Sequence, residues 1–299
     1  MQGFLLLCKP SGITSFSAVS AVKRMAHEKR VGHTGTLDPM ATGVLPIFLG
    51  RATALSSLML DGEKRYKATI KLGVTTDTED ITGTVLSKKE VTVTNEELLK
   101  ALENFKGKIL QTPPMYSALK KDGVRLYDLA RQGKTVEIPK REIEIFSIDL
   151  LSPLDEENCF TIDVKVSKGT YIRSLARDIG EFLGCGATLS ALERTSACGF
   201  DICQCVALKE LTNENIADYI VSEETAVTHL RAVNITEKQA VRFCNGGQLD
   251  FSRLHIENIT ENELIRVKFG NLFLGIGVAD IPNNRLNIKC IINDYNDCS

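Results

Sequence analysis

The chain has 299 residues, of which 43% are hydrophobic and 25% are charged, a composition typical of a globular protein with one large core or a main domain plus a small one. No run of about 18 or more apolar residues occurs, and the N-terminus has no basic leader, so we expect a cytoplasmic protein without a membrane span or signal peptide. The net charge of −2 disfavours a general nucleic-acid binder.

The first part of the chain predicts strands and helices in mixed order. Residues 3–8 are an apolar run typical of a buried strand, and Ser15 to about Ala26 has the spacing of an amphipathic helix. Residues 31–43 predict a loop, and Pro46 limits the apolar run 44–49 to a short or irregular strand. The elements predicted next are helices at 52–60, 95–105, 125–132 and 171–183, strands at 66–72 and 159–167, an acidic loop at 75–80, an irregular segment at 111–117 and an extended segment at 188–200.

The last part of the chain predicts a separate unit. A helix-like stretch at 236–245 precedes three short β-like runs at 264–269, 272–278 and 286–292. We therefore expect a main domain at 1–230 and a small β-rich module at 231–299. Strands and helices do not alternate in a regular β-α-β rhythm, which favours an α+β fold over a doubly wound α/β sheet.

One aspartate, Asp38, lies in the predicted loop between glycines. Pro39 biases it towards an extended backbone, and the glycines allow a substrate to approach closely. A short carboxylate on such a loop suits a nucleophile or a base. From spacing alone, an Asp-Pro turn in which the carboxylate caps its own backbone is the more common explanation.

The run Gly35-Thr36-Leu37-Asp38-Pro39-Met40-Ala41-Thr42-Gly43 resembles the catalytic motif of the TruB family of tRNA pseudouridine synthases. Other segments resemble further motifs of this family in the same order, namely residues 9–15, 65–68, 111–120, 168–178 and 189–195. The resemblance covers about residues 3–200 well and the C-terminal region weakly. It implies a pseudouridine-synthase catalytic fold, with a mixed, mainly antiparallel sheet flanked by helices, and a small C-terminal PUA-like RNA-binding module.

The resemblance also implies a reaction. We expect from it an enzyme that isomerises uridine-55 in the T-loop of tRNA to pseudouridine, with Asp38 as the nucleophile. Arg173 keeps that carboxylate charged, and Tyr66 stacks on the target base and assists the final proton transfer. Without the resemblance, Arg173 reads as a surface arginine and Tyr66 as a half-exposed strand tyrosine.

Further residues gain roles in substrate binding from the same resemblance. His33 acts as a wedge that fills the gap left by the flipped uridine, and Tyr171 and Leu192 line the uracil pocket. Lys9 and Lys120 complete the predicted contacts with RNA. Alone, His33 reads as a hydrogen-bonded loop residue, and Tyr171 and Leu192 as core residues.

Two local properties bear on the partners of the chain. Residues 117–141 carry seven Lys or Arg against three acidic residues, which fits an RNA-gripping insertion at about 112–142 that closes over phosphates. The nine cysteines include no Cys-x-x-Cys pair, and no P-loop or dinucleotide fingerprint occurs, so we expect no metal and no other cofactor.

Three alternative functions remain open at this point. A guide-RNA-dependent relative would modify ribosomal RNA with partner proteins, but the absence of long basic tails favours a monomeric tRNA enzyme that needs no protein partner. A non-catalytic RNA-binding or tRNA-folding protein would not need Asp38, Tyr66 and Arg173 together. A carboxylate-based glycosidase would need a second, paired carboxylate.

Overall fold

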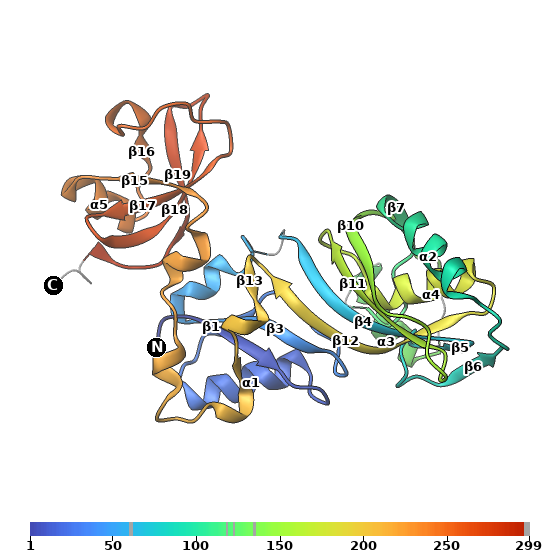
Figure 1. Ribbon diagram of the computed structural model, residues 1–299. Helices are drawn as coiled ribbons and strands as arrows, with labels where there is room; N and C mark the ends of the chain where they lie inside the picture. The colour runs from blue at the N-terminus through green and yellow to red at the C-terminus, as the bar shows by residue number, and fades with distance from the viewer. Residues whose placement is uncertain (60–61, 118, 122, 134–135, 296–299) are drawn as a thin grey trace.

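Two mixed sheets, one of ten strands and one of five, organise the described part of the chain (Figure 1). The computed structural model describes residues 1–59, 62–117, 119–121, 123–133 and 136–295. In Figure 1 the long strands β4 and β12 run through the middle of the large sheet and connect its two halves. The predicted combination of a mixed sheet with helices and a separate C-terminal β-rich unit is confirmed.

The large sheet is mainly antiparallel, and only the pairs β1–β14 and β3–β12 are parallel. In sheet order its strands are β14 (Val206–Ala207), β1 (Gly3–Lys9), β3 (Thr42–Leu49), β12 (Ala187–Ala197), β4 (Lys64–Leu72), β11 (Cys159–Val166), β10 (Arg141–Ser152) and β7 (Gly107–Gln111). Two short strands extend it, namely β2 (Val31–His33) beside β3 and β13 (Phe200–Asp201) beside β12. Separate two-stranded hairpins are formed by β5 (Val74–Thr76) with β6 (Val85–Lys88) and by β8 (Lys120–Lys121) with β9 (Val124–Arg125).

Helix α4 packs on the large sheet and α5 on the C-terminal sheet. The α-helices are α1 (Ser15–Met25), α2 (Asn95–Asn104), α3 (Leu126–Arg131), α4 (Ile172–Phe182) and α5 (Glu237–Cys244). Short 3₁₀ helices occur at η1 (Gly50–Leu55), η2 (Ile202–Gln204), η3 (Leu208–Glu210), η4 (Ile216–Tyr219), η5 (Glu223–Val227) and η6 (Phe251–Arg253). Thr94 begins α2 with a capping box to Glu97, which satisfies backbone groups that a helix start leaves unpaired.

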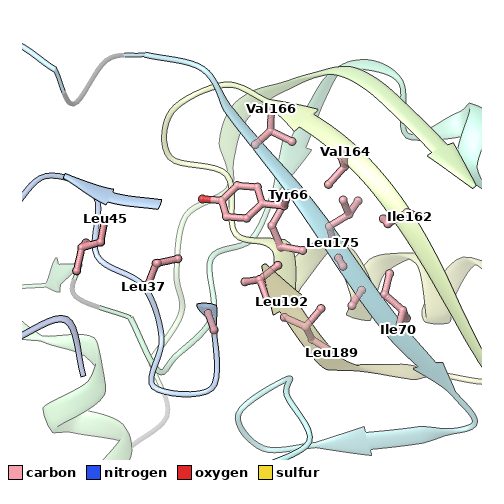
Figure 2. Close-up of a cluster of buried hydrophobic side chains, with 14 of the residues drawn as sticks. Leu37, Leu45, Tyr66, Ile70, Ile162, Val164, Val166, Leu175, Leu189 and Leu192 are labelled. Carbon is pink, nitrogen blue, oxygen red and sulfur yellow. The ribbon is translucent and has the colours of Figure 1, made fainter. Parts of the chain in front are cut away.

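The main core lies where α4 packs against β4 and β12. Figure 2 shows Tyr66 and Ile70 of β4 together with Leu189 and Leu192 of β12 and Leu175 of α4 in one apolar cluster. Burial of these side chains fixes the position of α4 relative to the two central strands. The start of α4 is thereby held at the middle of the sheet.

The C-terminal sheet has its own apolar core around Phe243. Its strand order is β15 (Arg231–Asn234), β17 (Leu264–Phe269), β18 (Leu272–Asp280), β19 (Arg285–Ile291) and β16 (Leu249–Asp250). A further cluster joins it to the large sheet, because Phe273 and Ile276 of β18 pack with Phe4 of β1 and Phe48 of β3. The two units therefore share buried apolar surface.

Several local predictions were wrong. Residues 31–33 form β2 rather than loop, and β3 begins two residues earlier than predicted and includes Pro46. The proline is tolerated because β12 pairs with β3 only at Thr42 and Gly43, while the Pro46 carbonyl accepts a bond from the Thr34 amide at 3.2 Å. The helix predicted at 52–60 is the shorter η1, and the twelve-residue strand β10 was not predicted.

Candidate active site

Asp38 lies on the loop between β2 and β3, and the start of α1 holds this loop on both sides of it. Thr14 caps α1, and the Ser15 hydroxyl accepts from the Leu37 amide at 2.9 Å and donates to the Leu37 carbonyl at 3.0 Å. On the other side, the Gly12 amide donates to the Pro39 carbonyl at 2.8 Å. These bonds fix the backbone that carries the carboxylate.

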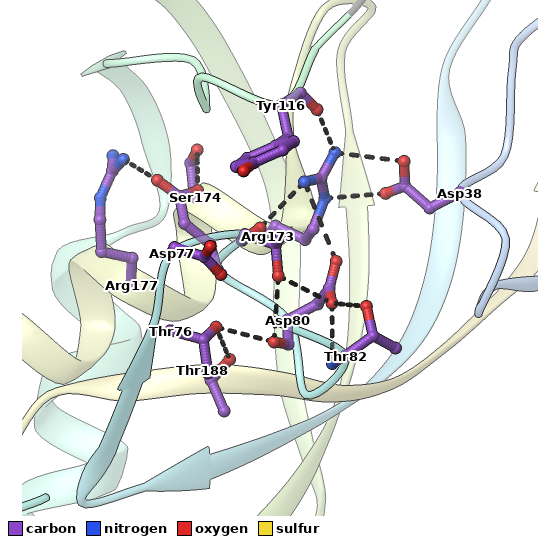
Figure 3. Close-up of polar contacts among 12 residues, drawn as sticks. Asp38, Thr76, Asp77, Asp80, Thr82, Tyr116, Arg173, Ser174, Arg177 and Thr188 are labelled. Carbon is purple, nitrogen blue, oxygen red and sulfur yellow. Dashed lines mark hydrogen bonds and ion pairs between the residues drawn. The ribbon is translucent and has the colours of Figure 1, made fainter. Parts of the chain in front are cut away.

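Arg173, in the first turn of α4, grips this carboxylate with two nitrogens (Figure 3). Its Nε lies 2.8 Å from Asp38 Oδ2, and its Nη2 donates to Asp38 Oδ1 at 3.1 Å. The Arg173 side chain is 6% exposed, whereas that of Asp38 is 34% exposed. A two-pronged guanidinium–carboxylate contact fixes both charge and orientation. Asp38 is thus anchored from inside and open to solvent on its other side.

The remaining guanidinium donors of Arg173 are also used. Nη1 donates to the Thr78 carbonyl and Nη2 to the Tyr116 carbonyl, both at 2.9 Å. The Asp80 carboxylate lies 3.9 Å from Nη1 and accepts from Thr82. Of these partners, Asp80 was visible in the sequence only as part of an acidic loop, and neither carbonyl contact leaves a signal in the sequence.

Tyr66 and Leu192 lie on one face of the sheet near the Asp38 loop. Tyr66 and Ala68 are two residues apart on β4, and Ala68 is paired with Leu192 of β12, so the two side chains share that face. Their exposed fractions are 7% and 8%. Figure 2 shows the Tyr66 ring beside Leu37, the neighbour of Asp38. Tyr66 is therefore buried, and the alternative of a half-exposed strand tyrosine is wrong.

Tyr171 precedes α4 and is tied to the end of β7 by one side chain. The buried Gln111 accepts from the Tyr171 amide at 2.9 Å and donates to the Tyr171 carbonyl at 3.1 Å. Burial raises the pKa of the Tyr171 hydroxyl. Gln111 was not singled out in the sequence, although it lies in a segment that resembles a family motif.

His33 ends β2 and is held among buried groups. Its Nδ1 has no hydrogen-bond partner in the described part of the chain, and burial, followed by the charge of Arg194, lowers the pKa of its ring below 6.5. Arg194 is 1% exposed and donates to the carbonyls of Val44 at 2.8 Å and Gly35 at 2.7 Å. Arg194 therefore holds the loop between His33 and Asp38 through the Gly35 carbonyl. The sequence did not reveal this role.

Two lysines were predicted to contact RNA, and the structure describes the side chain of one of them, Lys9. Lys9 is fully buried, its ammonium donates to the carbonyls of Pro10, Ile13 and Pro39, and burial lowers its pKa to about 8. This geometry argues against the predicted substrate contact, because the donors are used inside the protein to hold the Asp38 loop. The backbone of Lys120 lies in β8, but its side chain is outside the described residues.

Outside this site, two global observations concern metals and membranes. Among the described residues, no three His, Cys, Asp or Glu side chains gather as a metal site would require. None of the described helices is long and apolar enough to cross a membrane. The eight cysteines in the described ranges are all free thiols.

Two family models match the chain consecutively. The model described as TruB family pseudouridylate synthase (N terminal domain) matches residues 23–172, and the one described as tRNA pseudouridylate synthase B C-terminal domain matches residues 173–233. The boundary between them separates Asp38 and Tyr66 from Arg173 and Leu192, so the site draws on both matched regions.

Individual relatives agree with the family models. A tRNA pseudouridine synthase B of Clostridium perfringens (strain 13 / Type A) is 43% identical over 296 residues, covering 98% of this chain and 100% of its own. That of Geotalea uraniireducens (strain Rf4) is 42% identical over 297 residues, covering 97% and 95%. A solved structure of a Cbf5-Nop10-Gar1 complex has a chain with a TM-score of 0.76 and 25% identity, covering 98% of this chain and 86% of that one. The chain therefore belongs to the TruB family of pseudouridine synthases and is an isomerase that acts on tRNA.

Proposed function

We propose that the chain converts uridine-55 in the T-loop of tRNA to pseudouridine, with Asp38 as the nucleophile. The observation that carries this proposal is the Asp38–Arg173 pair, in which a buried guanidinium holds a carboxylate that is still 34% exposed. The two-pronged contact fixes the orientation of the carboxylate, while the open side of Asp38 leaves room for a nucleoside to meet a nucleophile.

The proposed chemistry needs no oxidant and no reductant. The Asp38 carboxylate displaces uracil N1 from ribose C1′, the base turns, and uracil C5 then displaces the carboxylate as the bond between C1′ and C5 forms. The proton on C5 is then lost and N1 gains one, so atoms and electrons balance. Tyr66 supplies a ring to stack on the base and a hydroxyl for that proton transfer, and Leu192 and Tyr171 bound the uracil.

The target uridine is stacked inside folded RNA and must be extruded, which costs a few kcal/mol. We assign to His33 the role of the wedge that occupies the vacated space. Its position at the end of β2, five residues before Asp38 and next to the loop that Arg194 holds, supports this role. The lowered pKa of the ring keeps it neutral at pH 7, which favours stacking over ion pairing with phosphate.

We further propose that the enzyme works alone, as a monomer in the cytoplasm where tRNA matures. Residues 1–230 form the catalytic domain, the insertion at 112–142 grips the T-arm, and residues 231–299 form a second RNA-binding unit. The rival is guide-dependent modification with partner proteins. Turnover of a bare tRNA transcript by the purified chain supports the stand-alone enzyme, and turnover only with added guide RNA and proteins would exclude it.

The decisive experiment is primer extension on unmodified tRNA after carbodiimide labelling. We expect a stop at position 55 after incubation with the unaltered enzyme and none with Asp38→Asn, which keeps the shape of the side chain but removes its charge. Glu224→Gln is the matched control, because Glu224 pairs with Arg266 at 2.8 Å outside the site. A stop that persists with Asp38→Asn would remove Asp38 from the reaction, and a stop at another uridine would change the assigned position.

A further inference from the structure

We propose that Glu79 and Arg177 are positioning residues for the Asp38–Arg173 pair. Their ion pair keeps two structures in place, the Thr78 carbonyl and the root of the insertion (residues 112–116). Both of these hold Arg173 against Asp38. The proposal rests on the proposed function, because it takes the Asp38–Arg173 pair as the reaction centre. Within the described part of the chain, neither residue forms a hydrogen bond or an ion pair with Asp38, so we infer that they act on it through Arg173.

The backbone of Glu79 adopts an unfavourable conformation at the point where it supports Arg173. Its φ is 63°, in the left-handed region that a residue with a Cβ rarely occupies. The angle φ is the rotation about the N–Cα bond of Glu79. It sets the direction of the preceding peptide group, whose carbonyl belongs to Thr78. That carbonyl accepts from Arg173 Nη1 at 2.9 Å. The unfavourable φ of Glu79 therefore helps to point the Thr78 carbonyl at Arg173.

The helix that carries Arg173 also holds Glu79 in this conformation. The Glu79 carboxylate accepts from the Ser174 hydroxyl at 2.7 Å and from Arg177 Nη1. Its backbone carbonyl accepts from the Leu189 amide of β12 at 3.0 Å. Burial raises the pKa of Glu79, and the charge of Arg177 is the largest influence that opposes the shift. The ion pair thus offsets part of the cost of burying this carboxylate.

Arg177 extends the same arrangement to the root of the insertion. Its Nη2 donates to the Thr112 carbonyl at 3.0 Å, while Arg173, one helical turn earlier, donates to the Tyr116 carbonyl at 2.9 Å. Figure 3 shows Arg177, Ser174 and Arg173 along α4, with Asp38 beyond Arg173. Two arginines of one helix therefore hold two carbonyls of the segment that begins the insertion. Displacement of Arg177 would move the segment that supports Arg173.

A rival explanation is that the Glu79–Arg177 pair only stabilises the fold. The two explanations differ in what they predict for glycine at position 79. Glycine adopts a φ of 63° without the clash of a Cβ, so Glu79→Gly loses the ion pair but keeps the preferred direction of the Thr78 carbonyl. Glu79→Ala loses the ion pair and retains the unfavourable backbone.

The test measures the single-turnover rate of pseudouridine formation with enzyme in excess, together with tRNA affinity and Tm. We expect Glu79→Ala and Arg177→Ala to lower the rate about tenfold or more, since small misplacements of catalytic groups have effects of this size, while the affinity for tRNA changes much less than the rate. Glu79→Gly should recover a large part of the rate lost in Glu79→Ala. The control Glu224→Ala breaks an ion pair of similar burial, that of Glu224 with Arg266, and should lower Tm without changing the rate.

Two results would overturn the inference. One is a normal rate in Arg177→Ala and Glu79→Ala despite a lower Tm, which would make the pair purely structural. The other is a Glu79→Gly rate no higher than that of Glu79→Ala, which would exclude the backbone of Glu79 from the effect. Full activity of Asp38→Asn would instead refute the proposed function, so the two failures are distinguishable.

Discussion

His33 combines a ring at the end of a strand with a buried, unpaired Nδ1 and a lowered pKa. If the ring fills the space of the extruded base, its removal should slow the reaction more than it weakens binding. Stacking is worth about 1–3 kcal/mol, so His33→Ala should reduce the single-turnover rate by about 5- to 150-fold. Filter binding should show little change in tRNA affinity.

A second variant at this position separates stacking from hydrogen bonding. His33→Phe keeps a flat ring but has no nitrogen, so it should retain much more activity than His33→Ala. Because the pKa of His33 is lowered below 6.5, the ring is already neutral at pH 7, and raising the pH from 7 to 8 should not change its contribution. Equal losses of rate and affinity in His33→Ala would assign the residue to binding instead.

The residues of the site differ in whether their roles could be predicted from the sequence. Asp38 and Arg173 lie in segments whose residue order resembles family motifs, so both were predicted and the structure brings them into contact. The roles of Lys9 and Arg194 could not be predicted, because each donates to backbone carbonyls that fold next to it, in one case 150 residues away. A carbonyl acceptor is present at every residue and leaves no trace in the sequence.

At the scale of elements, regular periodicity was informative and irregular strands were not. The predicted helices at 95–105 and 171–183 correspond closely to α2 and α4, whose apolar residues recur on one face. The twelve-residue strand β10 was missed because its pairing with β11 shifts between Ile145 and Ser147 and again between Leu150 and Ser152. Such shifts break the alternation that a strand prediction depends on.

The proposed contact of the insertion with RNA can be tested directly. Its hairpin, β8 and β9, contains Lys120, Lys121 and Arg125. Neutralising these three residues together should lower the slope of log affinity against log salt by about 2–3, the value expected for three phosphate contacts. The single-turnover rate at saturating enzyme should change much less than the affinity.

The matched control for this experiment neutralises Lys100, Lys106 and Lys108, three exposed lysines on or near α2 and β7. That triple variant makes the same change in net charge and should leave the salt slope unaltered. An equal decrease in both triple variants would show that only the overall charge matters. An unchanged slope in the hairpin variant would remove these side chains from the RNA interface.

At the scale of the whole molecule, the site depends on topology that the sequence could not supply. Asp38 and Arg173 are 135 residues apart. They meet because β3 pairs in parallel with β12, while α4 packs on β12 and β4. Strand order is set by long-range pairing, which local periodicity does not encode. The mixed composition predicted the α+β class, but not which strands would be neighbours.

The cluster shared by the two sheets has a consequence for how the C-terminal unit should be tested. Removing residues 231–299 would uncover Phe4 and Phe48, so a loss of tRNA affinity after truncation would combine lost contacts with lost stability. Point substitutions separate the two effects. Phe273 lies in the shared cluster, whereas Phe243 lies in the core of the C-terminal sheet alone.

Phe→Ala substitutions at these two positions should therefore destabilise different parts of the molecule. Each Phe→Ala substitution in a core costs about 3–5 kcal/mol. Phe273→Ala should speed amide hydrogen exchange in β1 and β3 as well as in β18, because it removes packing against Phe4 and Phe48. Phe243→Ala should speed exchange only within the C-terminal sheet. Unchanged exchange of β1 and β3 in Phe273→Ala would show that the two units are energetically independent, and truncation would then be a valid test of tRNA binding.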